Sequence, residues 1–230
     1  MYKFLYFRFK RRQDKAEMAL MQRWVKPGSV VVDVGANIGF YSRYFSELTG
    51  TRGMVYSFEP DAYNYRRLLE TLTGYPNVVT ENAAVSDNTG TLQFFLSPDK
   101  NVDHRAYATD THSESYTVRC ISLDEFLDEE TAIDFMKVDV QGYEMSVYKG
   151  AEQLLTFNTD IKILSEFWPY GLEKAGSSKE AFFEFFHSRN FNVYLLEGES
   201  LRKLAAQDLP SFPVNEANYY NVLICKEELG

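Results

Sequence analysis

The chain has 230 residues and a net charge of −9, with 24 lysines and arginines against 33 aspartates and glutamates. Its hydrophobic and charged fractions, 45% and 25%, are typical of a globular protein that builds a core without disulfides or metals. The acidic balance argues against nucleic acid as a partner, because binding to phosphate backbones depends on clustered lysine and arginine. The two cysteines, Cys120 and Cys225, lie far apart in the sequence, which favours a reducing compartment; we expect a cytoplasmic protein.

Aromatic and basic residues alternate along the first twelve positions, between Tyr2 and Arg12. Arg8 interrupts the apolar stretch, so the segment does not have the pattern of a signal peptide. Two interpretations remain open: the arm packs on the domain or on a partner subunit in a dimer, or it contacts an anionic membrane surface as a peripheral element. We expect residues 1–27 to form this arm and an entry helix, and residues 28–230 to form one domain.

The first half of the chain alternates between strand and helix patterns. Apolar spacing predicts an entry helix over 13–25, and a β-branched run ending at Gly35 predicts a strand over 29–34, buried on both faces. The segments that follow continue the alternation: a helix over 38–48, a strand over 54–58, a helix over 62–72 and a strand over 77–82. Repeated β-α-β units predict a doubly wound parallel sheet, and therefore an α/β fold.

The alternation stops in the middle of the chain and then resumes. Residues 91–96 and 116–121 have strand patterns with no helix between them, and the polar segment 98–115 is long enough to suggest a lid over a site. The remaining predicted elements are strands over 133–138, 161–166 and 191–196, helices over 144–149 and 179–188, and a last strand over 218–225. We expect this last strand to close one edge of the sheet.

Two motifs at strand ends indicate a nucleoside ligand. Gly35 and Gly39 follow the first strand with a GxxxG spacing, which differs from the GxGxxG of dinucleotide sites and disfavours a nicotinamide oxidoreductase. The Asp33 carboxylate at this turn would attract the ammonium and sulfonium groups of S-adenosylmethionine. Glu59, twenty residues after Gly39, ends the second strand, where an acid accepts hydrogen bonds from ribose hydroxyls.

Five strings in fixed order resemble the FkbM family of S-adenosylmethionine-dependent methyltransferases over about residues 28–166. They are VVVDVGANIGFYS, VYSFEPDAYNYRRL, NAAVSDNTGTL, SLDEF and IDFMKVDVQGYEMSVYKGA. The resemblance implies a class I methyltransferase fold, which is Rossmann-like, with a mostly parallel seven-stranded sheet, an antiparallel last strand and an insertion around residues 91–121. It also implies S-adenosylmethionine as cofactor, with Asp33, Gly35, Asn37 and Gly39 around its methionine part, Glu59 at the ribose, and Asn82 and Ala83 at the adenine. Pro60, next to Glu59, is a further candidate cofactor-binding residue.

Three residues are candidates for handling the acceptor's proton: Asp139 at the end of a strand beside the first one, His104 in the predicted lid, and Glu166 after a later strand. The family commonly has DVEG where this chain has Asp139-Val140-Gln141-Gly142, so Gln141 removes one negative charge. Arg105, Trp168 and Tyr170 are candidate substrate contacts, because a guanidinium and aromatic rings can bind a sugar or another ring-shaped acceptor. The alternative for the aromatic pair is a hydrophobic plug under the loop. We expect no metal, because the sequence offers no third ligand beside Asp139 and Glu166.

The resemblance implies an enzyme that methylates a hydroxyl of a small molecule, sugar or glycan. In-line methyl transfer depends mainly on positioning the acceptor oxygen and excluding water. The alternative is a non-catalytic, cofactor-binding scaffold domain of a biosynthetic complex. This alternative stays open because Gln141 replaces the glutamate that the family commonly has at this position.

Overall fold

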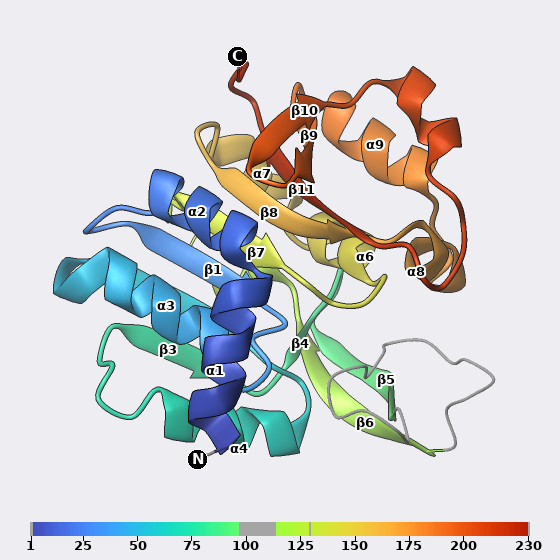
Figure 1. Ribbon diagram of the computed structural model, residues 1–230. Helices are drawn as coiled ribbons and strands as arrows, with labels where there is room; N and C mark the ends of the chain where they lie inside the picture. Colours follow the sequence, from blue (N-terminus) through green and yellow to red (C-terminus); the bar gives the residue numbers. More distant parts are fainter. Residues whose placement is uncertain (1, 97–113, 129, 230) are drawn as a thin grey trace.

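The computed structural model describes residues 2–96, 114–128 and 130–229. The strands of its main sheet are β1 (Val30–Val34), β2 (Met54–Phe58), β3 (Val78–Glu81), β7 (Phe135–Val138), β8 (Lys162–Phe167), β9 (Asn192–Glu197), β10 (Ser200–Lys203) and β11 (Tyr220–Cys225). They lie in the order β10-β9-β11-β8-β7-β1-β2-β3 (Figure 1). The predicted α/β fold with a mostly parallel sheet is confirmed.

Helices cover both faces of this sheet, because successive side chains of a strand point to opposite faces. The helices are α1 (Tyr2–Gln13), α2 (Lys15–Trp24), α3 (Phe40–Thr49), α4 (Ala62–Thr71), α5 (Leu123–Phe126), α6 (Glu144–Lys149), α7 (Glu152–Phe157), α8 (Pro169–Lys174) and α9 (Lys179–His187). Val31 and Phe135 pack with α2 and α3, whereas Val32 and Met136 pack with α6, α7 and α9. The continuous apolar sequence of β1 follows from this burial on both sides.

The strand register determines which side chains meet at the edge where the parallel strands end. β1 pairs in parallel with β2 and β7, and Asp33 lies opposite Ser57 on one side and Lys137 on the other. β7 pairs in parallel with β8, so the ends of β2, β1, β7 and β8 lie next to one another. A ligand site at this edge is the usual arrangement in open α/β sheets.

The last strand differs from the prediction. β11 runs antiparallel to both β8 and β9, as the family fold implies, but it lies between them and does not close the edge. The edge position is taken by β10, an eighth strand that pairs with β9 across a tight turn at Gly198, which has a φ of +62°. The β10 side chains are half-buried or exposed, so its short sequence lacks the apolar alternation that would have revealed it.

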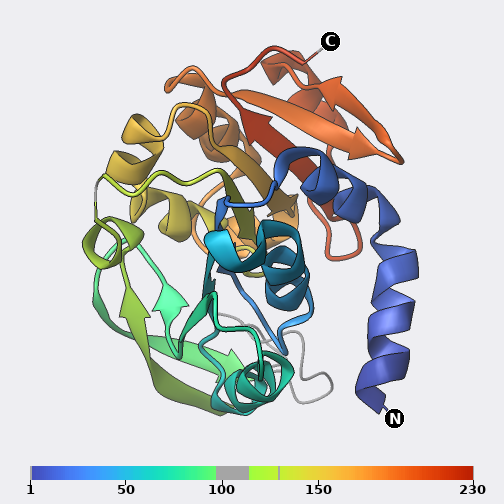
Figure 2. The same ribbon diagram turned by 90° about the vertical axis from the view of Figure 1, so that its left-hand side faces the viewer.

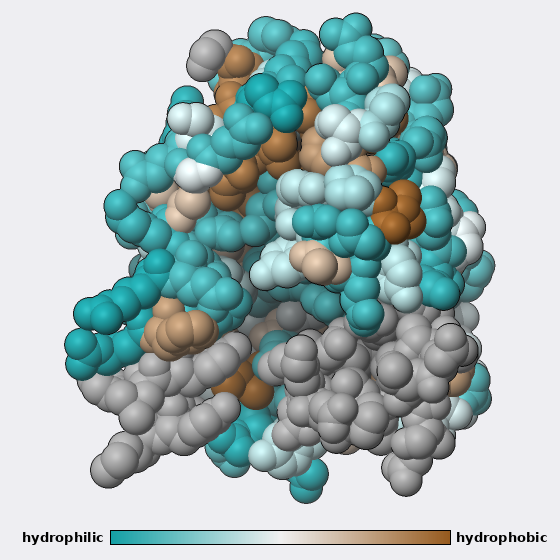
Figure 3. Space-filling model, turned by 45° about the vertical axis from the view of Figure 1, so that its right-hand side comes forward, coloured by the Kyte–Doolittle hydropathy of each residue, from teal (hydrophilic) through white to brown (hydrophobic). Residues whose placement is uncertain are grey.

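A second, three-stranded sheet is formed by the segment between β3 and β7, in the middle of the chain. Its strands are β4 (Ala84–Val85), β5 (Gly90–Leu96) and β6 (Glu114–Ile121), in the order β4-β6-β5. β5 and β6 pair antiparallel, which confirms both strands predicted from the sequence. The predicted lid lies almost entirely outside the described residues. On the side toward which the parallel strands run, the described surface is largely hydrophilic, with apolar side chains in separate patches (Figure 3).

Two helices precede β1. The entry helix predicted over 13–25 is α2, and the basic, aromatic arm is the helix α1, which runs along the outside of the molecule (Figure 2). Phe7 of α1 packs edge-on against Phe40 of α3, with ring centroids 5.2 Å apart. Among the helices of the described residues, none has the length and apolar character needed to cross a bilayer.

Candidate active site

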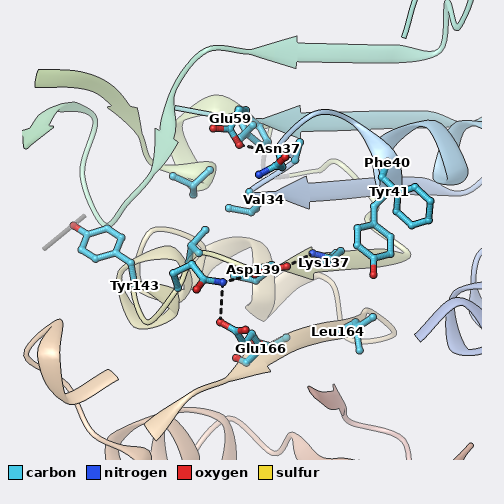
Figure 4. A pocket seen from close by; sticks show the side chains of 18 of the residues that line it. Val34, Asn37, Phe40, Tyr41, Glu59, Lys137, Asp139, Tyr143, Leu164 and Glu166 are labelled. Carbon is cyan, nitrogen blue, oxygen red and sulfur yellow. Dashed lines mark hydrogen bonds and ion pairs between the residues drawn. The ribbon is translucent and has the colours of Figure 1, made fainter. Parts of the chain in front are cut away.

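A cavity of about 790 Å³ lies at the carboxyl ends of β1, β2, β7 and β8 (Figure 4). Its size is that of a site for a small molecule or cofactor. One end is formed by the loop after β1, the end of β2 and Phe94 of β5, and the other by α1, α2, Tyr41 of α3 and the segment around Tyr219. The cavity lining therefore combines the N-terminal helices and a segment near the C-terminus with the central sheet.

The loop after β1 requires glycine at its first position. Gly35 has a φ of +81°, and a Cβ on it would lie 2.0 Å from the backbone oxygen of Asp139. The backbone N–H groups of Gly35 and Ala36 both donate to the carbonyl of Phe58, at 3.0 and 2.9 Å. The loop is thus held between the end of β2 and the end of β7, where a side chain would not fit.

Glu59 lies at the end of β2 with both carboxylate oxygens bound to backbone. Oε2 accepts from the N–H of Asn37 at 2.8 Å, and Oε1 accepts from the N–H of Asp61 at 2.9 Å. Burial raises the pKa of Glu59 to about 8, against the opposing effect of these two hydrogen bonds. Each oxygen keeps a second lone pair, so the carboxylate can still accept a hydrogen bond from a ligand hydroxyl in the cavity.

Asp33 lies behind this site and does not line the cavity. The strand alternation turns its side chain toward α3, where the Ser42 hydroxyl donates to Oδ2 at 2.6 Å. Burial raises the pKa of Asp33, against the effect of the Lys137 ammonium. The contact ties α3 to β1 beneath the glycine loop, and the direct cofactor contact expected of Asp33 stays a prediction.

Asp139, at the end of β7, is surrounded by hydrogen-bond donors. Lys137 Nζ lies 3.0 Å from Oδ2, and the Gln141 amide donates to Oδ1 at 3.2 Å and to Glu166 Oε2 at 3.3 Å (Figure 4). Burial would raise the pKa of Asp139, but the Lys137 ammonium, together with Lys10 and the Gln141 amide, outweighs burial and the net pKa is lowered. Gln141 therefore joins the two predicted catalytic carboxylates, Asp139 and Glu166, through one neutral amide.

The turn that carries Gln141 is held from behind by Glu144. Gln141 and Gly142 have left-handed φ values of +55° and +96°. Glu144 Oε1 accepts from the N–H groups of Val140 at 3.3 Å and Gly142 at 3.0 Å, which fixes this conformation. Glu144 is fully buried, and burial raises its pKa to about 7.

The far end of the cavity holds polar residues that the sequence did not single out. The Tyr41 hydroxyl donates to Asp14, at the junction of α1 and α2, and Lys10 Nζ lies 2.8 Å from the same carboxylate. Lys137 lies over the Tyr41 ring, 4.5 Å from its centroid. Nothing in the sequence links position 14 to position 41 or 137, so only the fold could reveal this cluster.

The structure brings most of the predicted site residues together. Those that line the cavity are Gly35, Asn37, Glu59, Pro60, Ala83, Asp139, Glu166 and Trp168. The described residues that lie outside its lining are Asp33, Gly39, Asn82 and Tyr170. Asn82 still donates to the carbonyl oxygens of Glu59 and Pro60, and Tyr170 lies beside Trp168. His104 and Arg105 lie outside the described residues, where their predicted roles are not tested.

The raised pKa values make stability depend on pH. Glu59 and Glu144 bind protons more tightly in the folded chain than in the unfolded chain, where a glutamate titrates near pH 4.5. The unfolded state therefore binds fewer protons between pH 4.5 and 8, and the free energy of unfolding falls as pH rises through this window. We expect a loss on the order of 3 kcal/mol or more between pH 5 and pH 8.5 without ligand, measured by urea unfolding.

A Glu144→Gln variant provides the control for this effect. It removes one of the two titrations, so its stability should fall less steeply with pH. A wild-type chain that becomes more stable toward pH 8.5 would contradict the burial of both groups as neutral acids. The lowered pKa of Asp139 acts in the opposite direction, but only below its ordinary range near pH 4.

Comparison with known proteins agrees with this architecture. The methyltransferase FkbM domain model matches residues 33–193. A methyltransferase FkbM from Methylobacillus flagellatus is similar with a TM-score of 0.53 and 16% identity, over 86% of this chain and 43% of that chain. An rRNA methylase from Streptococcus thermophilus has a TM-score of 0.54 and 13% identity, over 92% and 95% of the two chains. Fibrillarin from Aeropyrum pernix, solved with natively bound S-adenosylmethionine, has a TM-score of 0.51 and 13% identity, over 91% and 73%.

The sheet topology and these neighbours define a class I, Rossmann-like methyltransferase fold. No curated protein matches the chain. The domain match covers well over half of the sequence, and the chain belongs to the FkbM methyltransferase family.

S-adenosylmethionine is the cofactor of this family, and the cavity fits it. Glu59 offers carboxylate lone pairs suited to ribose hydroxyls, and the glycine loop leaves the backbone bare where a ligand must approach closely. Ala83 and Phe94 give the same end of the cavity apolar walls suited to a base. Among the residues from 2 to 96, 114 to 128 and 130 to 229, no cluster of three histidine, cysteine or acidic side chains could hold a metal.

Proposed function

We propose that this chain transfers a methyl group from S-adenosylmethionine to a hydroxyl of a small molecule, sugar or glycan. The observation that carries the proposal is the position of Asp139 and Glu166 in the same cavity as Glu59, with the Gln141 amide between them. The cavity thus has a nucleoside end and a second end with hydrogen-bond acceptors. An acceptor hydroxyl needs such an oxygen to orient its proton away from the incoming methyl group.

The residues that line the cavity orient the acceptor and exclude water from it. When bound, the cofactor supplies an electrophilic methyl group. Asp139 accepts a hydrogen bond from the acceptor hydroxyl; because its pKa is lowered, it is a weak base that mainly orients this group and takes the proton late. Gln141 holds the Asp139 and Glu166 carboxylates in place, and the exposed Tyr219 ring offers a surface on which a sugar ring can stack, whereas Trp168 is buried in the cavity wall.

Calorimetric titration with S-adenosylmethionine, S-adenosylhomocysteine and NAD tests the first part of the proposal. We expect micromolar binding of the two adenosyl ligands and no heat from NAD. Binding of NAD alone, or of none of the three, would contradict it. Cofactor binding without S-adenosylhomocysteine formation from any hydroxylated acceptor, including methyl glycosides, would favour the scaffold function instead.

An Asp139→Asn variant tests the second part. We expect kcat to fall by about 100-fold, because an amide orients the hydroxyl poorly and does not accept its proton, while the dissociation constant of S-adenosylmethionine changes little. Asp160→Asn, at an exposed aspartate distant from the cavity, is the matched control. An unchanged kcat in Asp139→Asn would exclude Asp139 from the reaction and leave Glu166 or His104 as the candidate.

A further inference from the structure

The helix α1 differs in charge from the rest of the chain. It contains five basic residues and no acidic one: Lys3, Arg8, Lys10, Arg11 and Arg12. Outside α1 the chain has 19 basic and 33 acidic residues, a net charge of −14. The helix α1, which borders the cavity, is therefore net positive, whereas the rest of the chain is net negative.

The side chains of α1 divide into an inner and an outer face. Phe7 and Lys10 lie one turn apart and face the body, where Phe7 meets Phe40 and Lys10 meets Asp14. Arg8, Phe9 and Arg12 are exposed on the opposite side, and 62% of Phe9 is accessible. The helix runs along the outside of the molecule, so this outer face is open (Figure 2).

We propose that the outer face of α1, formed by Arg8, Phe9 and Arg12, docks on an anionic membrane surface. Arginines gain electrostatic attraction to anionic headgroups, and an aromatic side chain between them can enter the interface. A polyanion such as RNA would offer the arginines the same charges, but the −14 charge of the body opposes wrapping by a phosphate polymer. The same repulsion makes α1 the part of the molecule that faces the membrane.

Docking in this way would bring the α1 wall of the cavity to within about 10 Å of the membrane, the diameter of one helix. Lys10 and Gln13 of α1 line the cavity, and they lie within about one helical turn of Arg8, Phe9 and Arg12. An acceptor held by the bilayer, such as the sugar of a glycolipid, would then lie on the outer side of α1, about one helix diameter from the cavity. That such an acceptor is the substrate rests on the proposed function, whereas the docking itself does not.

Vesicle sedimentation tests the docking with the full chain. We expect binding to vesicles that contain 30% phosphatidylserine, little binding to pure phosphatidylcholine, and a marked loss between ~50 and ~500 mM salt. The double variant Arg8→Gln/Arg12→Gln should weaken binding by about 30-fold, from the usual contribution of each basic residue near an anionic surface. Arg52→Gln/Lys149→Gln removes the same charge from two exposed positions elsewhere and should bind like the wild type.

The outcomes separate the docking from the methyltransferase function. Equal binding to anionic and neutral vesicles, or unchanged binding of the α1 variant, would overturn the proposal, as would an arginine-dependent dimer in sedimentation velocity with no vesicle binding. Calorimetry with S-adenosylmethionine on the same preparations tests the cofactor site independently. Unfolding midpoints of both double variants near the wild-type value would show that the lost charge, not misfolding, causes the change.

Discussion

A Glu59→Ala variant should bind S-adenosylmethionine about 100-fold more weakly than the wild type, or worse. The carboxylate is the acceptor suited to the ribose hydroxyls, and hydrogen bonds to a charged group each contribute about 1.5–3 kcal/mol. The substitution also leaves the N–H groups of Asn37 and Asp61 without their acceptor, so the glycine loop loses an anchor. Calorimetric titration with S-adenosylmethionine and S-adenosylhomocysteine measures the loss.

Glu81→Gln is the matched control for this experiment. Glu81 ends the neighbouring strand β3, pairs with Arg119 at 2.6 Å and does not line the cavity, so its substitution should leave cofactor affinity unchanged. Because burial raises the pKa of Glu59 to about 8, binding to the ionised carboxylate should release a proton near pH 7. Titrations in buffers of different ionisation enthalpy detect that proton. Wild-type affinity in Glu59→Ala would refute the ribose assignment.

A Gly35→Ala variant should lose both stability and cofactor binding. The new Cβ would lie 2.0 Å from the Asp139 carbonyl oxygen, so the loop after β1 and the turn after β7 must move apart. The left-handed φ of +81° adds about 1–2 kcal/mol of strain for a residue with a side chain. We expect the unfolding midpoint to fall by about 10 °C and S-adenosylmethionine binding to become undetectable by calorimetry.

A Gly74→Ala variant distinguishes the effect of backbone strain from the effect of the steric clash at Gly35. Gly74 has nearly the same φ, +88°, but a Cβ there would meet nothing within 4 Å. Its substitution should lower the midpoint by only about 3 °C and leave cofactor binding intact. Similar losses in both variants would mean that the contact between Gly35 and Asp139 does not determine the shape of the site.

Much of the fold follows from local sequence patterns. The β-branched run before Gly35 and the apolar segment ending at Phe58 predict strands buried on both faces, and the structure confirms β1 and β2 there. Glu59 and Gly35 are recognisable because a strand end followed by glycine or an acid is a local signal. The sequence did not predict β10, and the prediction that the last strand closes the edge was wrong, because pairing order depends on contacts between distant segments.

The sequence by itself determined the α/β class and the family, because both are encoded in short contiguous strings around Gly35, Glu59 and Asp139. Only the tertiary structure brought Tyr41 to Asp14 and Lys137, and placed α1 beside the cavity. The two contacts of Tyr41 join residues that are 27 and 96 positions apart. The order in which strands from distant segments pair decides which of these residues meet, and that order depends on contacts across the whole fold.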